Sequence, residues 1–151
     1  MNLVIKKFEE LDALEVYKIL ELRSEVFIVE QKCAYQDCDG KDKNSYHLYS
    51  QDNGEIVSYL RIIKQGVSYD EISIGRVLVD KNYRGKGLAK IMMHKAIDFI
   101  EKDLNVTQIR ISAQVYLMNF YKSLGFKEVS NRYFEDGIPH IEMFYENNIG
   151  I

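Results

Sequence analysis

The residue pattern with the clearest chemical meaning is a turn that contains two glycines and follows an apolar run. The apolar run is Val77-Leu78-Val79, and the turn ends in Arg84-Gly85-Lys86-Gly87-Leu88-Ala89. Glycines at the start of a helix let backbone N–H groups approach an anion, and the helix dipole favours negative charge there. Arg84 and Lys86 add positive charge. The pattern predicts a pyrophosphate-binding turn, although a strand-to-helix turn that needs glycine only for its shape has the same sequence.

Two common nucleotide-binding motifs do not match this turn. A P-loop has four residues between its glycines and then Gly-Lys followed by Ser or Thr, whereas one residue separates Gly85 from Gly87. A dinucleotide-binding Rossmann motif has a third glycine and an acidic residue at the end of the next strand. Lys90 stands at the third position, and the next strand ends in Ser112-Ala113-Gln114. The turn therefore belongs to neither class.

Two arginines interrupt runs that are otherwise apolar and predict strands, namely Arg61 and Arg76. A charge in a central strand is costly unless it is paired or faces a wet cleft. One interpretation is that both arginines pair with carboxylates such as Glu30 or Glu142. The other is a pocket that recognises an acidic or phosphorylated group through bidentate contacts. Gly75, next to Arg76, indicates a bulge in its strand.

The acidic segment Asp37 to Asp42 is not an EF-hand calcium loop. Such a loop has glycine in its sixth position and glutamate in its twelfth, whereas here glycine is fourth and the twelfth residue is Leu48. We therefore expect a solvated acidic loop. Cys33 and Cys38 have no second ligand pair at zinc spacing, so no metal site is expected, and two free thiols are typical of a reducing cytoplasm.

Length and charge place the chain among single-domain proteins. A chain of 151 residues with a net charge of −3 and a pI of about 5.7 fits one domain over residues 1–151. A slightly acidic protein lacks the basic face that broad nucleic-acid binding needs. No apolar run approaches the roughly 18 residues of a membrane span, and the N-terminus lacks a signal peptide's apolar core. A cytoplasmic protein is expected.

Hydrophobic periodicity and turn residues predict a mixed sheet covered by helices. Asp12 with Glu15 forms a capping box that opens a helix, and Asn53-Gly54 is a strong hairpin signal. The expected strands are Leu3–Phe8, Tyr46–Ser50, Glu55–Lys64, Glu71–Val79, Val106–Ser112, Lys127–Val129 and Ile138–Tyr145. The expected helices begin at Asp12, Gly85 and Tyr116. The apolar stretch Val26–Val29 continues or restarts the first helix, and Gly125 ends the last. The longest irregular segment runs from Gln31 to Asn44.

Two motifs, in this order along the chain, resemble those of the GNAT superfamily of N-acetyltransferases. They are Arg84-x-x-Gly87-x-Ala89 and Asn119-Phe120-Tyr121 followed by Gly125-Phe126. Further segments, spread over nearly the whole chain, are similar to the ElaA-type branch of this superfamily. These segments are Leu22-Arg23-x-x-Val26-Phe27-x-x-Glu30-Gln31, Tyr35-x-Asp37-x-Asp39, His47, Gly75-Arg76-Val77 and Glu135-Asp136-Gly137-Ile138-Pro139-His140. The resemblance implies an α+β fold, an α/β/α sandwich whose mixed, mostly antiparallel sheet contains a splayed parallel strand pair.

The resemblance also implies acetyl-CoA as the donor substrate, bound where the two parallel strands diverge, and no metal. A backbone N–H of the strand before the glycine turn would polarise the thioester carbonyl. The residues expected to contact the donor are Val77, Leu78, Val79, Arg84, Gly85, Lys86, Gly87, Leu88, Ala89, Asn119 and Tyr121.

Acetyl transfer to an amine needs proton transfers, and the resemblance assigns residues to them. An alkylamine has a pKa near 10.4 and must lose a proton before it attacks, while a phenol can protonate the leaving thiolate. Tyr121 is expected to be this general acid; alternatively it is a core aromatic residue whose hydroxyl binds backbone. The candidate bases are Glu30, His47, Asp136 and His140. His47 could equally be a core histidine.

The predicted function is acetyl-CoA-dependent N-acetyl transfer to a primary amine, on a small molecule or a peptide, by direct attack in a ternary complex. The residues expected to contact the acceptor are Arg61, Arg76, Gln114, Tyr35 and Asp136. The alternative is a CoA-binding sensor or interaction module with the same fold and little turnover. Neither nucleic acid nor a membrane is an expected partner. The sequence leaves the acceptor, the base, any redox role of the cysteines and the choice between monomer and homodimer open.

Overall fold

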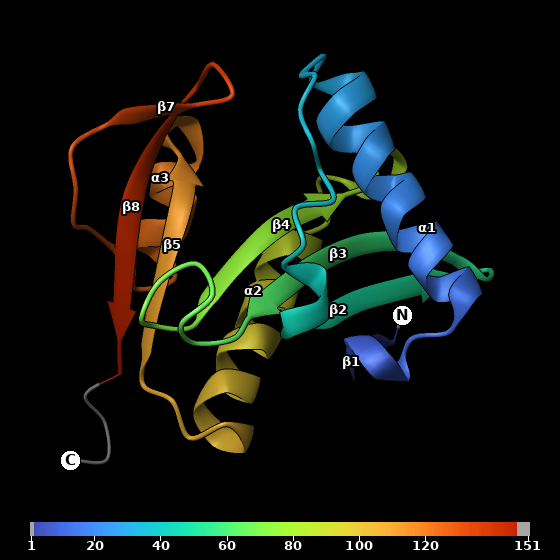
Figure 1. The fold of residues 1–151 in the computed structure, drawn as a ribbon, viewed down its shortest axis with the longest axis horizontal. Helices are drawn as coiled ribbons and strands as arrows, with labels where there is room; N and C mark the ends of the chain where they lie inside the picture. Colours follow the sequence, from blue (N-terminus) through green and yellow to red (C-terminus); the bar gives the residue numbers. More distant parts are fainter. Residues whose placement is uncertain (1, 148–151) are drawn as a thin grey trace.

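The computed structural model describes residues 2–147 (Figure 1). Its first sheet is antiparallel and contains β1 (Leu3–Lys7), β2 (Ser45–Asp52), β3 (Glu55–Ile63) and β4 (Ser73–Val79), in that spatial order. The turn between β2 and β3 has positive φ angles at Asn53 (52°) and Gly54 (79°), as a two-residue type I′ turn requires. The hairpin predicted from these two residues is confirmed.

The second sheet is built from the C-terminal part of the chain. Its strands are β5 (Gln108–Gln114), β6 (Lys127–Glu128), β7 (Tyr133–Glu135) and β8 (Ile138–Glu146), and β8 pairs with each of the other three. β7 was not predicted, because it is three residues long and its central Phe134 is 76% exposed. A strand this short carries no clear alternation of apolar and polar residues.

β4 and β5 connect the two sheets at a single point and then diverge (Figure 1). Ile72 and Ile109 form one parallel bridge, and the Arg110 N–H donates to the Ile72 carbonyl at 3.0 Å. No further pairing between these strands is formed within the described residues. The predicted splayed parallel pair is therefore present, and both strands lead away from this bridge toward the candidate site.

β4 also contains the bulge that Gly75 indicated. Tyr59 pairs with Leu78 and Arg61 with Gly75, so two residues of β4, Arg76 and Val77, lie opposite a single residue of β3. Arg76 has a φ of 52°, a left-handed conformation that is unfavourable for a residue with a side chain. The bulge changes the direction of β4 beside the candidate site.

Helices cover both faces of the sheet. α1 (Ala13–Arg23) begins after the predicted capping box, in which Asp12 and Glu15 exchange hydrogen bonds of 2.8 and 2.9 Å, and Ser24–Glu30 continues it as a π-helix. α2 (Leu88–Asp98) begins after Gly87, which has a φ of 74°. α3 (Met118–Ser123) is short and is followed by Gly125, with a φ of 101°.

Two hydrophobic clusters hold these layers together. One contains α1 and its continuation, where Ile19, Leu22 and Phe27 are buried in the same cluster as Tyr59 and Leu78 of the sheet. The other contains α2; its buried residues include Leu60, Ile62, Met92, Met93, Ala96, Ile109 and Ile111. The predicted α/β/α arrangement is confirmed (Figure 1). None of the helices within residues 2–147 has the length and apolar character needed to cross a membrane.

Candidate active site

Two cavities lie beside the diverging ends of β4 and β5 and share part of their walls. The loop cavity, of about 400 Å³, is lined by the glycine turn, by β4 and by the start of α2. The hairpin cavity, of about 550 Å³, is lined by the β7–β8 hairpin, by β4 and by residues of the irregular segment 31–44. The residues that line both cavities are Phe27, Gln31, Val77, Gln114, Leu117 and Tyr121. Molecules bound in the two cavities would therefore meet at this shared wall.

The loop cavity exposes the backbone of the glycine turn. Gly85 and Gly87 have φ angles of 80° and 74°, and a Cβ atom at either position would meet no other atom within 4 Å. Most of the predicted donor contacts line this cavity: Val77, Leu78, Val79, Arg84, Gly85, Gly87, Leu88, Ala89 and Tyr121. Lys86 and Asn119 are exposed and line neither cavity. An anion at the turn would meet open backbone at the N-terminus of α2.

Arg84 is held in place by Glu30. Its Nη1 and Nη2 atoms donate to the Glu30 carboxylate at 2.6 and 3.0 Å, and its Nε donates to the Val79 carbonyl at 2.9 Å. The hydrogen bond from Arg84 lowers the pKa of Glu30. Glu30 lines the loop cavity but not the hairpin cavity. A carboxylate already paired with a guanidinium is a poor proton acceptor, so this geometry does not favour Glu30 as the base.

Tyr121 lies in the wall that the two cavities share. It is 7% exposed and makes edge contacts with the rings of Phe120 and Phe126, at 5.2 and 6.0 Å between centroids. Its hydroxyl has no hydrogen-bond partner within residues 2–147, so the alternative of a hydroxyl bound to backbone is not observed. Burial, with a smaller contribution from Tyr116, raises the pKa of Tyr121 to about 12. The phenol is therefore protonated near neutral pH and is available to donate.

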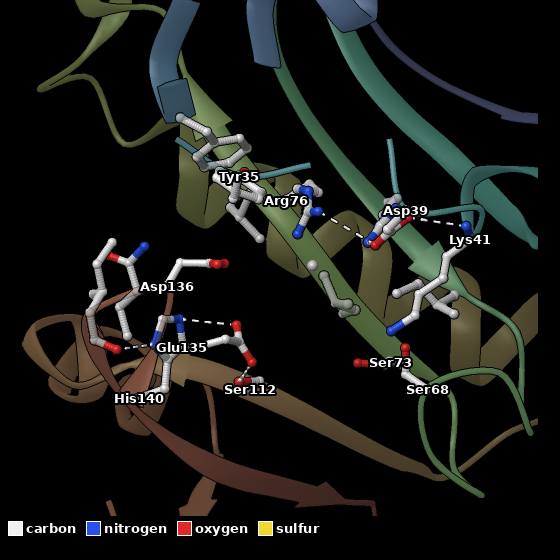
Figure 2. A pocket seen from close by; sticks show the side chains of 18 of the residues that line it. Tyr35, Asp39, Lys41, Ser68, Ser73, Arg76, Ser112, Glu135, Asp136 and His140 are labelled. Carbon is white, nitrogen blue, oxygen red and sulfur yellow. Dashed lines mark hydrogen bonds and ion pairs between the residues drawn. The ribbon is translucent and has the colours of Figure 1, made fainter. Parts of the chain in front are cut away.

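His140 is 7% exposed and presents one ring nitrogen to the hairpin cavity (Figure 2). Its Nδ1 is 2.7 Å from the Ile138 carbonyl, and a carbonyl can only accept, so in the neutral ring Nδ1 carries the proton. Nε2 then holds the lone pair, and it lies 3.4 Å from a carboxylate oxygen of Glu135. This pair can accept a proton and stabilise the resulting charge. Glu135 was quoted from the sequence only as part of a motif and was not predicted as a site residue; it pairs with Ile138 across the Asp136-Gly137 turn, two residues before His140 on β8, and this nearness in the sequence is the signal that could have found it.

His47 has a different environment from His140. It is 2% exposed, with Nδ1 2.6 Å from the Tyr59 hydroxyl and Nε2 2.9 Å from the Asp42 carbonyl. Burial lowers its pKa, and it lines neither cavity. Both ring nitrogens are occupied inside the fold, which is the core histidine considered as its alternative. We do not retain His47 as a base.

The carboxylates of the acidic segment are ion-paired, which the expectation of a solvated loop did not include, although Cys38, Asp39 and Gly40 are exposed. Asp37 is 6% exposed, because Arg23 and Arg76 both donate to it, at 2.8 and 2.7 Å. Asp39 accepts two hydrogen bonds from Arg61, at 2.8 and 2.5 Å. The residues of this arginine–aspartate network are Arg23, Arg61, Arg76, Asp37, Asp39 and Asp42. The loop folds over the sheet, and its aspartates neutralise arginines that would otherwise be buried without a partner.

The proposed partners of the strand arginines were also wrong. Glu30 pairs with Arg84, and Glu142 pairs with Arg110 at 3.4 Å. Arg61 and Arg76 do line the hairpin cavity, but their guanidinium groups already bind the network's aspartates. Of the two interpretations of these arginines, ion pairing is therefore the one observed.

The remaining predicted acceptor residues all line the hairpin cavity. Gln114 lies in the shared wall, and Asp136 belongs to the β7–β8 turn. The Tyr35 hydroxyl donates to Asp37 at 3.1 Å, and the Tyr35 ring lies 5.4 Å from the Arg76 guanidinium. Cys33 and Cys38 are free thiols, and no group of metal-ligating side chains occurs among the described residues. The geometry thus brings most of the predicted residues to one pair of connected cavities.

Known proteins resemble this chain over almost its whole length. A family model described as an acetyltransferase (GNAT) domain matches residues 10–147. Protein ElaA of Escherichia coli K12 is 40% identical over 139 residues, which are 91% of each chain, and a UPF0039 protein of Schizosaccharomyces pombe is 39% identical over 148 residues, 97% of each. The crystal structure of an acyl-CoA N-acyltransferase from Pseudomonas aeruginosa is 36% identical, with a TM-score of 0.90 over 96% of this chain and 99% of that one. The chain therefore belongs to the GNAT family of acetyltransferases, alongside relatives of the ElaA type.

Proposed function

We propose that the protein transfers the acetyl group of acetyl-CoA to a primary amine by direct attack within a ternary complex. The observation that carries this proposal is the pair of cavities that meet at Tyr121 and Gln114. One cavity has the open backbone turn that a pyrophosphate needs, and the other contains a histidine whose Nε2 lies beside a carboxylate and holds the lone pair of the neutral ring. Membership of the GNAT family supports acyl transfer in general.

The loop cavity fits the donor. The turn from Arg84 to Ala89 would hold the pyrophosphate through backbone N–H groups, with open space at both glycines. Acetyl-CoA supplies an acetyl group on a thioester, so a C–N bond forms as the C–S bond breaks. The bulge at Arg76 and Val77 interrupts the ladder between β3 and β4 next to the shared wall. Backbone N–H groups of this stretch are the candidates to stabilise charge on the carbonyl oxygen.

In the proposed reaction, His140 accepts a proton and Tyr121 donates one. His140 Nε2 accepts a proton from the acceptor's ammonium group, directly or through water, and Glu135, at 3.4 Å, stabilises the charged ring. Tyr121 donates its proton to the leaving sulfur. The nitrogen loses a second proton when the amide forms, which balances the proton given by Tyr121. One proton is therefore released for each acetyl group transferred.

The variant Tyr121→Phe tests this assignment. We expect kcat to fall by about 100-fold or more, because a positioned general acid contributes at least that much, while the Kd for CoA changes little. Release of the free thiol with a panel of amines measures kcat, and calorimetry measures CoA binding. Tyr145→Phe is the matched control, because Tyr145 contacts the same Phe126 ring at 5.4 Å but its hydroxyl binds Glu101 at 2.9 Å, outside both cavities.

Two outcomes would contradict the proposal. Wild-type turnover in Tyr121→Phe across the pH range would remove the general acid. Tight CoA binding by the wild-type protein without thiol release in the presence of any amine would instead favour the sensor or interaction module.

A further inference from the structure

We infer that the acceptor amine also carries an anionic group, a carboxylate or a phosphate, which binds Lys41, Ser68 and Ser73 at the end of the hairpin cavity away from His140. The inference rests on the proposed function and names its substrate class. The three residues, called the lysine end below, come from the segment before β2, from the β3–β4 connection and from the first position of β4. All three line the hairpin cavity.

The side-chain polar groups of the lysine end have no partners among residues 2–147. Figure 2 shows the Lys41 side chain extending toward Ser68 and Ser73. Within residues 2–147, the Lys41 ammonium forms no ion pair, and neither serine hydroxyl forms a hydrogen bond. An ammonium and two hydroxyls that face one cavity can together donate to the oxygens of a bound anion.

Charge balance explains why Lys41, unlike the two arginines that line the hairpin cavity, has no carboxylate partner within residues 2–147. The arginine–aspartate network contains three arginines and three aspartates, so its formal charges cancel. Asp39 is the network's aspartate that lines the cavity, and its two oxygens already accept from Arg61 and from the backbone N–H of Lys41 at 3.0 Å. The Lys41 side chain therefore has positive charge that nothing in the described protein neutralises.

The opposite end of the cavity has the opposite charge. Glu135 and Asp136 contribute carboxylates next to His140, as Figure 2 shows. Carboxylates at this end favour a positively charged ammonium group beside the nitrogen that would accept its proton. A molecule with an amine at one end and an anion at the other matches both ends of the cavity. Its volume of about 550 Å³ suits a small molecule.

Matched pairs of amines test the inference. Each ω-amino carboxylate, such as β-alanine or 4-aminobutyrate, is compared with the alkylamine of equal carbon number, and phosphoethanolamine is compared with ethanolamine. We expect kcat/KM to be about tenfold or more higher for the anionic member of the best pair, because hydrogen bonds to charged groups are strong. The carboxylate and phosphate pairs distinguish the two sources of the anion.

The variant Lys41→Gln should bring that kcat/KM ratio close to one, and Lys41→Arg should retain part of it. The backbone atoms of Lys41 hold the loop through Asp39 and Ser45, and these contacts survive a change of side chain. Lys43→Gln is the control, because it removes an equal charge from an exposed residue of the same segment that lines neither cavity. Thermal unfolding confirms that each variant is folded.

Calorimetry with the same amines in the presence of CoA separates this inference from the proposed function. If kcat/KM is equal within every pair, or if Lys41→Gln leaves the preference unchanged, the lysine end does not bind an anion of the acceptor. The proposal of acetyl transfer is unaffected by that result. Lys41-dependent binding without turnover supports the lysine end and overturns acetyl transfer. Absence of both binding and turnover overturns the two together.

Discussion

At the scale of single residues, hydrogen-bond partners decide what a histidine can do. Both ring nitrogens of His47 are occupied, by the Tyr59 hydroxyl and the Asp42 carbonyl. In His140 a backbone carbonyl occupies Nδ1, and Nε2 lies beside the Glu135 carboxylate in the hairpin cavity. The same imidazole is therefore fixed in the core in one case and able to exchange a proton in the other.

His140→Gln tests this difference. At pH 7 we expect kcat/KM to fall by about 10²- to 10⁴-fold, the usual contribution of a general base. The deficit should shrink as the pH approaches 10, because an alkylamine with a pKa near 10.4 then loses its proton without help. Thiol release measured from pH 7 to 10 gives the profile. His94→Gln, at an exposed position on α2 outside both cavities, is the control. If the loss of kcat/KM in His140→Gln stays constant with pH, His140 does not act as a base.

The positions of residues were predictable where a motif or an energetic cost indicated them. The motif placed Tyr121 beside the donor, and Tyr121 does lie in the wall that the two cavities share. The cost of an unpaired charge in a strand correctly limited Arg61 and Arg76 to two environments. The carboxylates that pair with them come from residues 37 to 42, where the chain has no periodicity that could predict which way a side chain points. The position of Glu135 beside His140, and that of Lys41 in the hairpin cavity, depend on how the loops fold over the sheet and were not predicted.

At the scale of elements, the start of α2 is the feature on which the proposed donor site depends. Gly87 is the last residue before the helix and has a left-handed φ of 74°, so the turn's backbone faces the loop cavity. Glycine adopts this conformation without strain, and any other residue is disfavoured there. The helix N-terminus and the open backbone together attract a phosphate.

Gly87→Glu should abolish measurable CoA binding. The added side chain enters open space beside the turn and brings a negative charge to the position that the pyrophosphate would take. Gly66→Glu is the matched control, because Gly66 has a φ of 83°, open space around it and no part in either cavity. Calorimetry should show normal binding in that control. Undiminished binding in Gly87→Glu would remove the turn from the donor site.

Elements with strong local signals were predicted well, and elements that depend on distant partners were not. The capping box before α1 and the Asn53-Gly54 hairpin are local, and both were correct. β4 begins at Ser73 rather than at Glu71, because its ladder with β3 ends at Ser73 and Ile72 forms its bridge with Ile109 of β5 instead. β7 exists because β8 pairs with it, and its own three residues carry no signal.

At the scale of the whole molecule, the arginine–aspartate network joins parts that share little backbone pairing. It attaches the segment 31–44 to α1 through Arg23, to β3 through Arg61 and to β4 through Arg76. The same segment forms part of the hairpin cavity's wall. The network therefore couples the stability of the fold to the shape of the candidate site.

Asp42→Asn tests how much this network stabilises the fold. Asp42 accepts from Arg23 and from Arg61, at 2.8 and 2.9 Å, and both arginines are buried. Removing its charge should lower the free energy of unfolding at pH 7 by about 3 kcal/mol, because two buried guanidinium groups then each lose one of their two carboxylate partners. Urea denaturation measures this, with Asp70→Asn, at an exposed position without an ion pair among the described residues, as the control.

The pH dependence of stability provides the sharper test, because its direction follows from the ionisation of the same carboxylate. Burial alone would raise the pKa of Asp42, but hydrogen bonds from Arg23 and Arg61 hold it below its usual value. A carboxyl whose pKa is lower in the folded state contributes stability above its unfolded pKa of about 4 and loses it as the pH falls further. The wild-type free energy of unfolding should therefore fall between pH 5 and pH 3, and Asp42→Asn should lose less over that interval. A variant that loses as much as the wild type would show that acid sensitivity arises elsewhere in the molecule.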